Sequence, residues 1–315
     1  MPTRTTDRDL LVELEPKAAE LLNRHEKVAK EWFPHEYVPW SLGRDFPAFF
    51  EGGDDWTPDQ PRLTGVAQTA FEVNLLTEDN LPSYHREIHE MFGAGDGAWI
   101  NWANRWTAEE NRHGIVLRDY LVVTRNIDPV ELERQRMKTM EAGYDREDKD
   151  ALRGMAYVAF QELATRISHR NTGMYSQDPV ADRIMSRISA DENLHMIFYR
   201  DMLHAALRID PSRMVEAITA EVLDFAMPGA VIEGFQRKAV QIANAGIYDL
   251  RIHHDEILWP LLRHWGIFGL EGLDEGGEKA RQELAAHLER LDKSATRFEE
   301  KRAARAARAA EKASA

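Results

Sequence analysis

The sequence predicts an all-α protein, and three observations support this fold class. Apolar residues recur with the period of an amphipathic helix along most of the chain, without a train of alternating strands. Connectors rich in Gly, Pro and Asp, such as "FEGGDDWTPDQP" and "DEGGE", interrupt that pattern. The segments "NIDPVELE" and "RIDPSRM" place Pro directly after Asp, which is typical of helix N-termini. We therefore expect a large bundle of helices.

The expected helices follow one another along the whole chain. With boundaries uncertain by ~2–4 residues, they cover roughly 7–30, 62–76, 97–126, 129–142, 148–171, 177–206, 210–225, 232–245, 249–265 and 276–311. Pro82 predicts a kink or break just after the second of them. We expect residues 1–275 to form a single bundle and residues 276–315 to form a C-terminal helix. Its Ala/Arg-rich end lacks an apolar face, which predicts a frayed, solvated tail.

The composition excludes several classes of protein. Acidic residues outnumber basic ones by 54 to 40, a net charge of −14 that disfavours a general nucleic-acid binder. The chain has no Cys, which excludes disulfides, thiolate catalysis and Cys-ligated metals. Its first residues lack a signal-type apolar core, and its apolar runs are too short to span a bilayer. We therefore expect a cytoplasmic protein without a membrane span.

One short pattern, Glu-x-x-His, occurs twice. Glu110 and His113 form it in "TAEENRHG", and Glu192 and His195 form it in "SADENLHM". Residues three apart lie on nearly the same face of a helix, so each pair can point at one place. A single pair of this kind is usually a solvated surface pair, whereas two pairs suggest a shared metal.

Both pairs lie on apolar helix faces. One stripe consists of Ala103, Trp106, Glu110, His113, Leu117 and Tyr120. The other consists of Met185, Ile188, Glu192, His195, Tyr199 and Met202. Glu78 and Glu162 also continue apolar faces, each about one helix and a turn before a pair. Glu109 and Arg112, by contrast, are expected off the stripe or at its margins.

Four carboxylates buried together are very costly unless cations compensate them. Two iron or manganese ions would do so, with two imidazoles completing the shells, as in ferritin-like di-metal bundles. We therefore expect a ferritin-like helix bundle with extra helices. Its expected metal ligands are Glu78, Glu110, His113, Glu162, Glu192 and His195.

Longer motifs carry a specific resemblance. "TEDNLPSYH", "WTAEENRHG", "FQELATRISHRNTG" and "ISADENLH" closely resemble the soluble acyl-acyl-carrier-protein desaturases, in particular their mycobacterial-type branch. The resemblance implies a large antiparallel bundle, generally a homodimer, with a buried di-iron site. It also implies an O2-dependent reaction that removes two hydrogens from adjacent methylenes of a saturated acyl chain. Acyl carrier protein would present that chain, and ferredoxin would supply electrons.

The resemblance assigns roles to further residues. It places Thr165 beside the O2 site, and it places Asp191 and Trp32 in an electron relay that reaches the metal through the first histidine ligand. Packing or hydrogen bonding is expected of two more motif members, Trp106 and His169. The sequences that flank the acyl tunnel differ from those of plant members, which leaves chain length and double-bond position open.

An acidic carrier protein would need a local basic surface on this acidic chain. The candidate docking groups are Arg134, Arg136 and Lys138, together with Arg237 and Lys238. By default, each cluster is a solvated helix face.

Rival functions remain to be weighed. A ferritin subunit is much shorter than this chain, and a ribonucleotide reductase radical subunit would carry a tyrosine where Leu117 stands. A di-iron acyl hydroxylase shares the same oxidant and stays open. So does a non-catalytic bundle that binds carrier protein and keeps its metal for stability. The choice between iron and manganese is also open, because carboxylates and imidazoles suit both.

Overall fold

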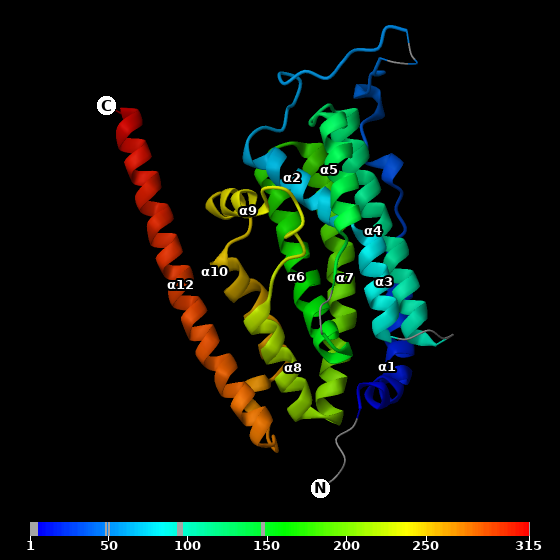
Figure 1. Cartoon of the computed structure of the whole chain (residues 1–315), viewed down its shortest axis with the longest axis vertical. Helices are drawn as coiled ribbons and strands as arrows, with labels where there is room; N and C mark the ends of the chain where they lie inside the picture. The colour runs from blue at the N-terminus through cyan, green and yellow to red at the C-terminus, as the bar shows by residue number, and fades with distance from the viewer. Residues whose placement is uncertain (1–5, 48, 50, 93–96, 146–148, 315) are drawn as a thin grey trace.

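The predicted all-α fold is confirmed. A computed structural model describes residues 6–47, 49, 51–92, 97–145 and 149–314, and within these ranges it contains helices and no strand. The long helices run side by side as an elongated bundle (Figure 1). None of the helices in the described ranges is long and apolar enough to cross a membrane.

The helices largely follow the predicted order. They are α1 (Asp7–Val28), α2 (Val66–Glu78), α3 (Leu81–Phe92), α4 (Ala98–Val123), α5 (Pro129–Ala142), α6 (Ala151–Ser176), α7 (Pro179–Ile209), α8 (Pro211–Asp224), α9 (Phe235–Asn244), α10 (Leu250–Ile252), α11 (Trp259–Trp265) and α12 (Glu275–Ser314). Short 3-10 turns cover Pro34–Glu36, Trp40–Leu42 and Ile267–Gly269. Asp128, Asp178 and Asp210 cap the helices that follow them, each accepting a backbone N–H through its side chain.

Helix α3 is the main departure from prediction. Pro82 was expected to kink or break the chain, but it is the second residue of a helix that begins at Leu81. Proline is tolerated there because the N–H groups of the first helical turn have no intrahelical partner to lose. The break that Pro82 marks is therefore the short turn between α2 and α3.

The predicted helix over 249–265 is interrupted. A π-helical segment, His253–Leu258, lies between α10 and α11. Pro260 follows it and has no N–H to donate to the carbonyl of Glu256, so the regular hydrogen-bond ladder cannot continue through this position. A wider turn accommodates that missing bond.

The described part of the core has three apolar clusters, and a polar centre lies between the two larger ones. Helix α7 packs against α1, α4 and α6, and α2 packs against α4 and α6. On α4, Trp106 belongs to one cluster and Val116 to the other; on α7, Met196 and Ile188 divide in the same way. The stretches between these residues carry the two Glu-x-x-His pairs.

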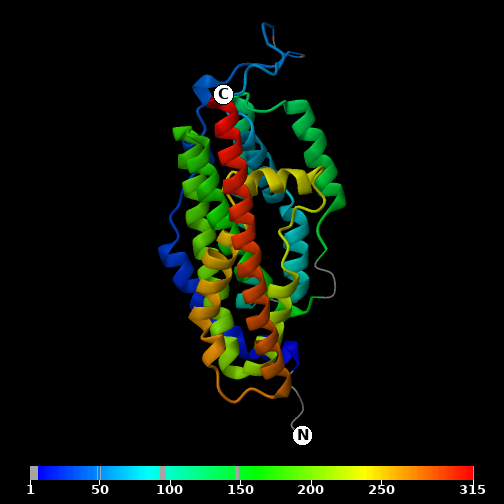
Figure 2. The ribbon, with the colours of Figure 1, turned by 90° about the vertical axis from the view of Figure 1, so that its left-hand side faces the viewer.

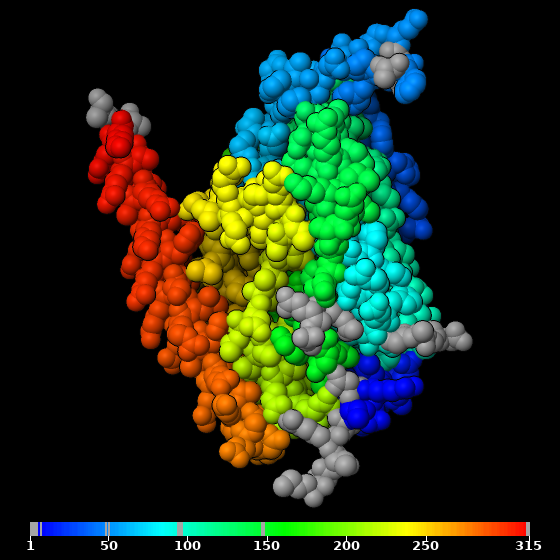
Figure 3. All heavy atoms as spheres, in the orientation of Figure 1, coloured from blue at the N-terminus to red at the C-terminus, as the bar shows by residue number. Residues whose placement is uncertain are grey.

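Helix α12 lies along one side of the bundle (Figure 2). It packs on α8 and α10, and its last turns project beyond the body of the molecule (Figure 3). The Ala/Arg-rich tail, for which we predicted a frayed end, forms these turns up to Ser314. Its side chains over 303–312 are exposed, as a solvated tail requires.

Candidate metal centre

Four helices bring the predicted ligands to one place. Helix α2 contributes its last residue, α4 and α7 each contribute a Glu-x-x-His pair, and α6 contributes one glutamate. The six side chains converge inside the bundle, and none of these residues is more than 7% exposed: Glu78, Glu110, His113, Glu162, Glu192 and His195. Gly114 lets this region pack closely, since a Cβ there would lie 2.8 Å from Asp79 Oδ1.

The donor atoms form two overlapping groups. One group contains Glu78, Glu110, His113 and Glu192; the other contains Glu110, Glu162, Glu192 and His195. Within each group, one donor atom per residue lies within 4.8 Å of the others. Glu110 and Glu192 belong to both groups, so each carboxylate can reach two cations at once. The donor set therefore fits a pair of metal ions, for which Glu110 and Glu192 would be the ligands common to both groups.

Several donor atoms lack any other use. Within the described part of the chain, Glu110 Oε1, Glu162 Oε2, Glu192 Oε1, His113 Nδ1 and His195 Nδ1 are buried without a hydrogen-bond partner. His195 Nδ1 lies 2.8 Å from Glu110 Oε1, yet without hydrogen-bond geometry. Buried polar atoms are normally paired. Unpaired oxygen and imidazole donors that face one another are what iron or manganese would complete.

The electrostatics also require positive charge at this centre. Burial and the neighbouring Glu192 carboxylate raise the pKa of Glu162 well above its usual range. The same two causes raise the pKa of Glu110. Burial alone would raise the pKa of Glu192 as well, but the His113 imidazole, whose Nδ1 lies 3.2 Å from Glu192 Oε1, keeps that pKa below its ordinary value. Without metal, protons must occupy part of this centre, and metal binding would displace them.

The metal-free protein should lose stability as the pH rises above about 6.5. Burial lowers the pKa values of the two histidine ligands, but the surrounding carboxylates raise them well above their ordinary value of 6.5. The folded chain then binds more protons than the unfolded chain, so the free energy of unfolding falls with increasing pH. We expect the melting temperature of chelator-treated protein to decline between pH 6.5 and 8.5 relative to iron-loaded protein. Parallel pH profiles of the two forms would contradict this.

The predicted relay residues lie behind His113. Asp191 Oδ2 is 3.5 Å from His113 Nε2, and Trp32 donates its Nε1–H to the same oxygen at 2.7 Å. Burial opposes the charge on Asp191, but His113, Arg187 and Trp32 hold its pKa down, at about 2. The Trp32 ring also stacks on His113, with ring centroids 6.4 Å apart. Trp32, Asp191 and His113 therefore form one continuous chain of contacts.

Thr165 lies at the edge of the centre. Its hydroxyl is 2.7 Å from Glu192 Oε2 and 3.1 Å from the backbone carbonyls of Gln161 and Glu162. A helical Thr commonly bonds back to such carbonyls. Here the shortest contact is with a carboxylate of the centre.

The two other motif members also contact the centre. Trp106 donates its Nε1–H to Glu162 Oε1 at 2.8 Å. His169 Nε2 lies 3.1 Å from Glu78 Oε1. Hydrogen bonding, one of the two roles expected of these residues, orients a carboxylate in each case.

One expectation about α4 is wrong. Glu109 was expected off the apolar face, but it is buried, and its Oε2 lies 2.9 Å from His195 Nε2. Helix α1 covers this flank of α4 and contributes His25, whose Nε2 is 2.8 Å from the same oxygen. The sequence held a signal for Glu109, because it directly precedes Glu110 as Asp191 precedes its own glutamate. It held none for His25.

Several predicted docking cations are engaged within the chain, including Lys138, which lies 2.7 Å from Glu233, and Arg134, which lies 3.9 Å from Glu131. Arg136 forms an ion pair with Asp79 and is 14% exposed. Lys238 lies 3.0 Å from Glu72 and is 13% exposed. Neither side chain is a free surface cation. The exposed members of the two clusters are Arg134, Lys138 and Arg237.

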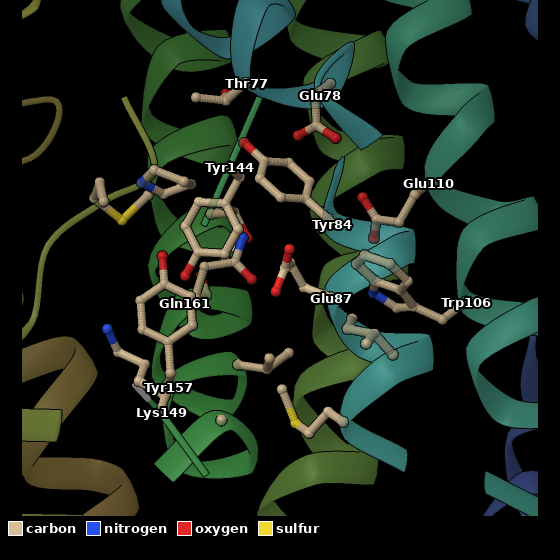
Figure 4. Close-up of a pocket in the computed structure, with 17 residues that line it drawn as sticks. Thr77, Glu78, Tyr84, Glu87, Trp106, Glu110, Tyr144, Lys149, Tyr157 and Gln161 are labelled. Carbon is tan, nitrogen blue, oxygen red and sulfur yellow. Dashed lines mark hydrogen bonds between the residues drawn. The ribbon is translucent and has the colours of Figure 1, made fainter. Parts of the chain in front are cut away.

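A cavity borders the centre. Figure 4 shows Glu78, Glu110 and Trp106 on one side of it, with Tyr144, Tyr157 and Gln161 across from them. The space between its lining side chains measures about 760 Å³, open solvent at the mouth included. Its further lining includes Thr77, Tyr84, Glu87, Ile88, Met91, Lys149, Gly154, Val158, Thr165, Met227 and Pro228.

Known proteins resemble this chain over nearly its full length. The family model described as fatty acid desaturase matches residues 6–314. A protein of Mycobacterium tuberculosis named acyl-acyl-carrier-protein desaturase DesA1 is 51% identical to this chain. The alignment covers 95% of this chain and 90% of the relative. A stearoyl-acyl-carrier-protein 9-desaturase 6, chloroplastic, of Arabidopsis thaliana is 31% identical over 86% of this chain and 73% of its own.

A solved structure agrees with these relatives. The crystal structure named for the acyl-acyl-carrier-protein desaturase DesA2 of Mycobacterium tuberculosis aligns with a TM-score of 0.69 and 31% identity. The alignment covers 86% of this chain and 98% of that one. The family model, the curated relatives and the shared helix bundle all agree, and the chain therefore belongs to the fatty acid desaturase family, in its acyl-acyl-carrier-protein branch.

Proposed function

We propose that this protein is an acyl-acyl-carrier-protein desaturase, which uses O2 and a di-iron centre to insert a cis double bond into a saturated acyl chain. The observation that carries the proposal is the cavity that Glu78, Glu110 and Thr165 share with apolar side chains. A methylene group placed there would lie directly against the proposed metal ligands. The names of the similar proteins support the same substrate class.

The cavity has the chemistry that an alkyl chain requires. Ile88, Met91 and Val158 provide apolar wall, and the rings of Tyr84 and Tyr157 add more. Burial raises the pKa of Tyr84 far above its usual range, so this hydroxyl stays neutral beside the chain. The wall can therefore hold an uncharged chain out of water and present it to the centre.

The metal ions would be held by the six converging side chains. Two reduced iron ions would supply O2 activation and the oxidising power that removes two hydrogens. Glu110 and Glu192, which belong to both donor groups, would contribute to holding each ion. Thr165 lines the cavity and its hydroxyl contacts Glu192, so this hydroxyl can give or take a proton between the two.

Electrons would arrive through Trp32 and Asp191 from a ferredoxin-type donor. Trp32 is buried, but Phe33 and Trp40 nearby in the chain are 44% and 50% exposed. Exposed aromatic side chains next to the relay provide a surface against which a redox partner could dock.

Carrier protein would dock near the cavity mouth. Helix α5 carries the exposed cations Arg134 and Lys138 and leads directly to Tyr144 on the cavity wall. Lys138 lies 2.7 Å from Glu233 and Arg134 lies 3.9 Å from Glu131, so an acidic partner would have to replace these exposed carboxylates at the two cations. We extend the proposal to a homodimer in the cytoplasm, on the strength of the family resemblance and the cysteine-free composition.

Mass analysis of the acyl product tests the proposed function. Iron-loaded protein would be incubated with a panel of acyl-carrier-protein thioesters, ferredoxin, its reductase and O2. We expect one panel member to lose two hydrogens, and fragmentation of the product to locate the double bond. The reaction should require every component, because O2 and two electrons are consumed for each bond formed.

The alternatives predict other masses. A gain of one oxygen atom in the product would identify a hydroxylase. Such an enzyme would use the same metal centre but would add oxygen to the acyl chain where a desaturase removes a second hydrogen. No change across the panel, with two iron ions bound per chain, would instead favour the non-catalytic bundle. In that case, removing the metal should lower the melting temperature, and the metal-loaded protein should have no desaturase activity to lose.

A further inference from the structure

We propose that Glu109 and His25 form a clamp that positions His195, so that helix α1, which provides no ligand, fixes one half of the metal centre. This inference rests on the proposed metal site. Both residues are positioning residues: neither touches the cavity, and each acts through His195. Helix α1 packs on α4 and α7, the two helices that carry the Glu-x-x-His pairs.

The contacts of the clamp are short and almost fully buried. Glu109 Oε2 lies 2.9 Å from His195 Nε2 and 2.8 Å from His25 Nε2. The exposed fractions of Glu109, His195 and His25 are 3%, 0% and 3%. Arg105 Nη2 lies 2.5 Å from the other carboxylate oxygen, Oε1, which supplies a compensating positive charge.

The clamp selects how His195 presents itself to the metal. A carboxylate only accepts hydrogen bonds, so Nε2 of His195 must carry the proton that it donates to Glu109. The neutral ring then has its lone pair on Nδ1. That atom points into the centre, 2.8 Å from Glu110 Oε1 and 3.5 Å from Glu162 Oε2. Fixing the tautomer and the ring orientation is the usual function of such outer partners of metal-binding histidines.

A similar arrangement, made of different residues, holds the other histidine of the centre. Glu109 on α4 contacts the histidine of α7, and Asp191 on α7 contacts the histidine of α4. Each carboxylate directly precedes a ligand glutamate in the sequence. The outer partner is His25 for Glu109 and Trp32 for Asp191, so residues 25–32 contact both carboxylates.

A third metal site is the rival reading of this cluster. His25, Glu109 and His195 each offer a donor atom within 4.8 Å of the other two. However, His195 has one nitrogen in the metal centre and the other on Glu109, and both N···O distances are those of hydrogen bonds. The geometry favours a proton between each ring and the carboxylate.

The test compares His25→Phe with His25→Gln in the full chain loaded with two iron ions. Phenylalanine fills the space but cannot donate to Glu109, whereas glutamine keeps an N–H donor. We expect iron release to a fixed chelator to accelerate by ~10–100-fold in His25→Phe and in Glu109→Ala. We also expect a changed ligand-field spectrum when either variant is loaded with Co²⁺, and substantial recovery of both readouts in His25→Gln. A purely structural role would leave the spectrum unmoved.

Glu221→Gln is the matched control. Glu221 is fully buried on α8, and Arg153 Nε lies 2.6 Å from it, away from the metal centre. The clamp would be overturned if Glu109→Ala, like this control, released iron at the wild-type rate and kept the wild-type Co²⁺ spectrum. It would also be overturned if His25→Phe and His25→Gln gave the same release rate and spectrum. Three Co²⁺ ions per wild-type chain would also overturn it, in favour of the third site. Wild-type protein that binds no metal pair would instead overturn the proposed function.

Discussion

Replacing Glu110 by alanine is expected to abolish desaturation. Glu110 belongs to both donor groups, so its loss removes a ligand from both cations at once. Replacing a residue that only hydrogen-bonds to a metal ligand typically lowers metal affinity or activity by ~10–100-fold. Loss of a ligand common to both donor groups should therefore lower turnover by more than ~100-fold. Product mass and iron content per chain are the two measurements. We expect less than two iron ions per chain in the variant.

The control for this prediction is again a buried carboxylate elsewhere. Glu221→Gln should keep two iron ions per chain, since Glu221 pairs with Arg153 and is not one of the six predicted ligands. The metal-free form of Glu110→Ala should also decline less with pH than metal-free wild type, because one buried carboxyl group is gone. A Glu110→Ala variant with two iron ions and normal turnover would refute the assigned centre.

Substituting Gly154 by leucine is expected to block the cavity without disturbing the metal. Gly154 lines the cavity on α6, and a Cβ there would lie 2.3 Å from the Cε atom of Met91. A larger side chain at this position must displace Met91 and fill part of the cavity in which we expect the acyl chain to bind. We expect kcat/KM to fall by ~100-fold, about 2.7 kcal/mol, while iron content and the Co²⁺ spectrum stay as in wild type.

A second substitution can restore the blocked cavity. Met91→Ala in the Gly154→Leu background removes the side chain that the leucine displaces, and should recover most of the lost kcat/KM. Gly154→Ala should have a small effect, because only the flexible end of Met91 must shift. Unchanged turnover in Gly154→Leu would mean that the acyl chain lies elsewhere.

The inward-facing positions of the proposed ligands could be predicted because helix geometry is local. Three-residue spacing places Glu110 beside His113 whatever surrounds them, and the apolar residues of the same stripe indicate that the pair faces inward. The same argument applies to Glu192 and His195. Burial of these residues then follows from the period of the pattern, without knowledge of the tertiary fold.

Contacts between distant segments were not predictable in this way. His25 lies 84 positions before Glu109, and nothing in either segment indicates that α1 covers α4. Similarly, Lys238 looked like a free cation until the fold placed Glu72 beside it. Pro82 correctly indicated a break after α2, but local sequence did not show that this proline lies in the first turn of a further helix, α3.

Stepwise loading with iron tests the central claim most directly. Metal-free protein would receive increasing ferrous iron without O2, and then carrier-bound acyl substrate, reductant and O2, before the acyl product is weighed by mass spectrometry. We predict that product lacking two hydrogens rises to a plateau at two iron ions per chain. A plateau at one iron ion, or the same product without any metal, would contradict a reaction that depends on both halves of the centre.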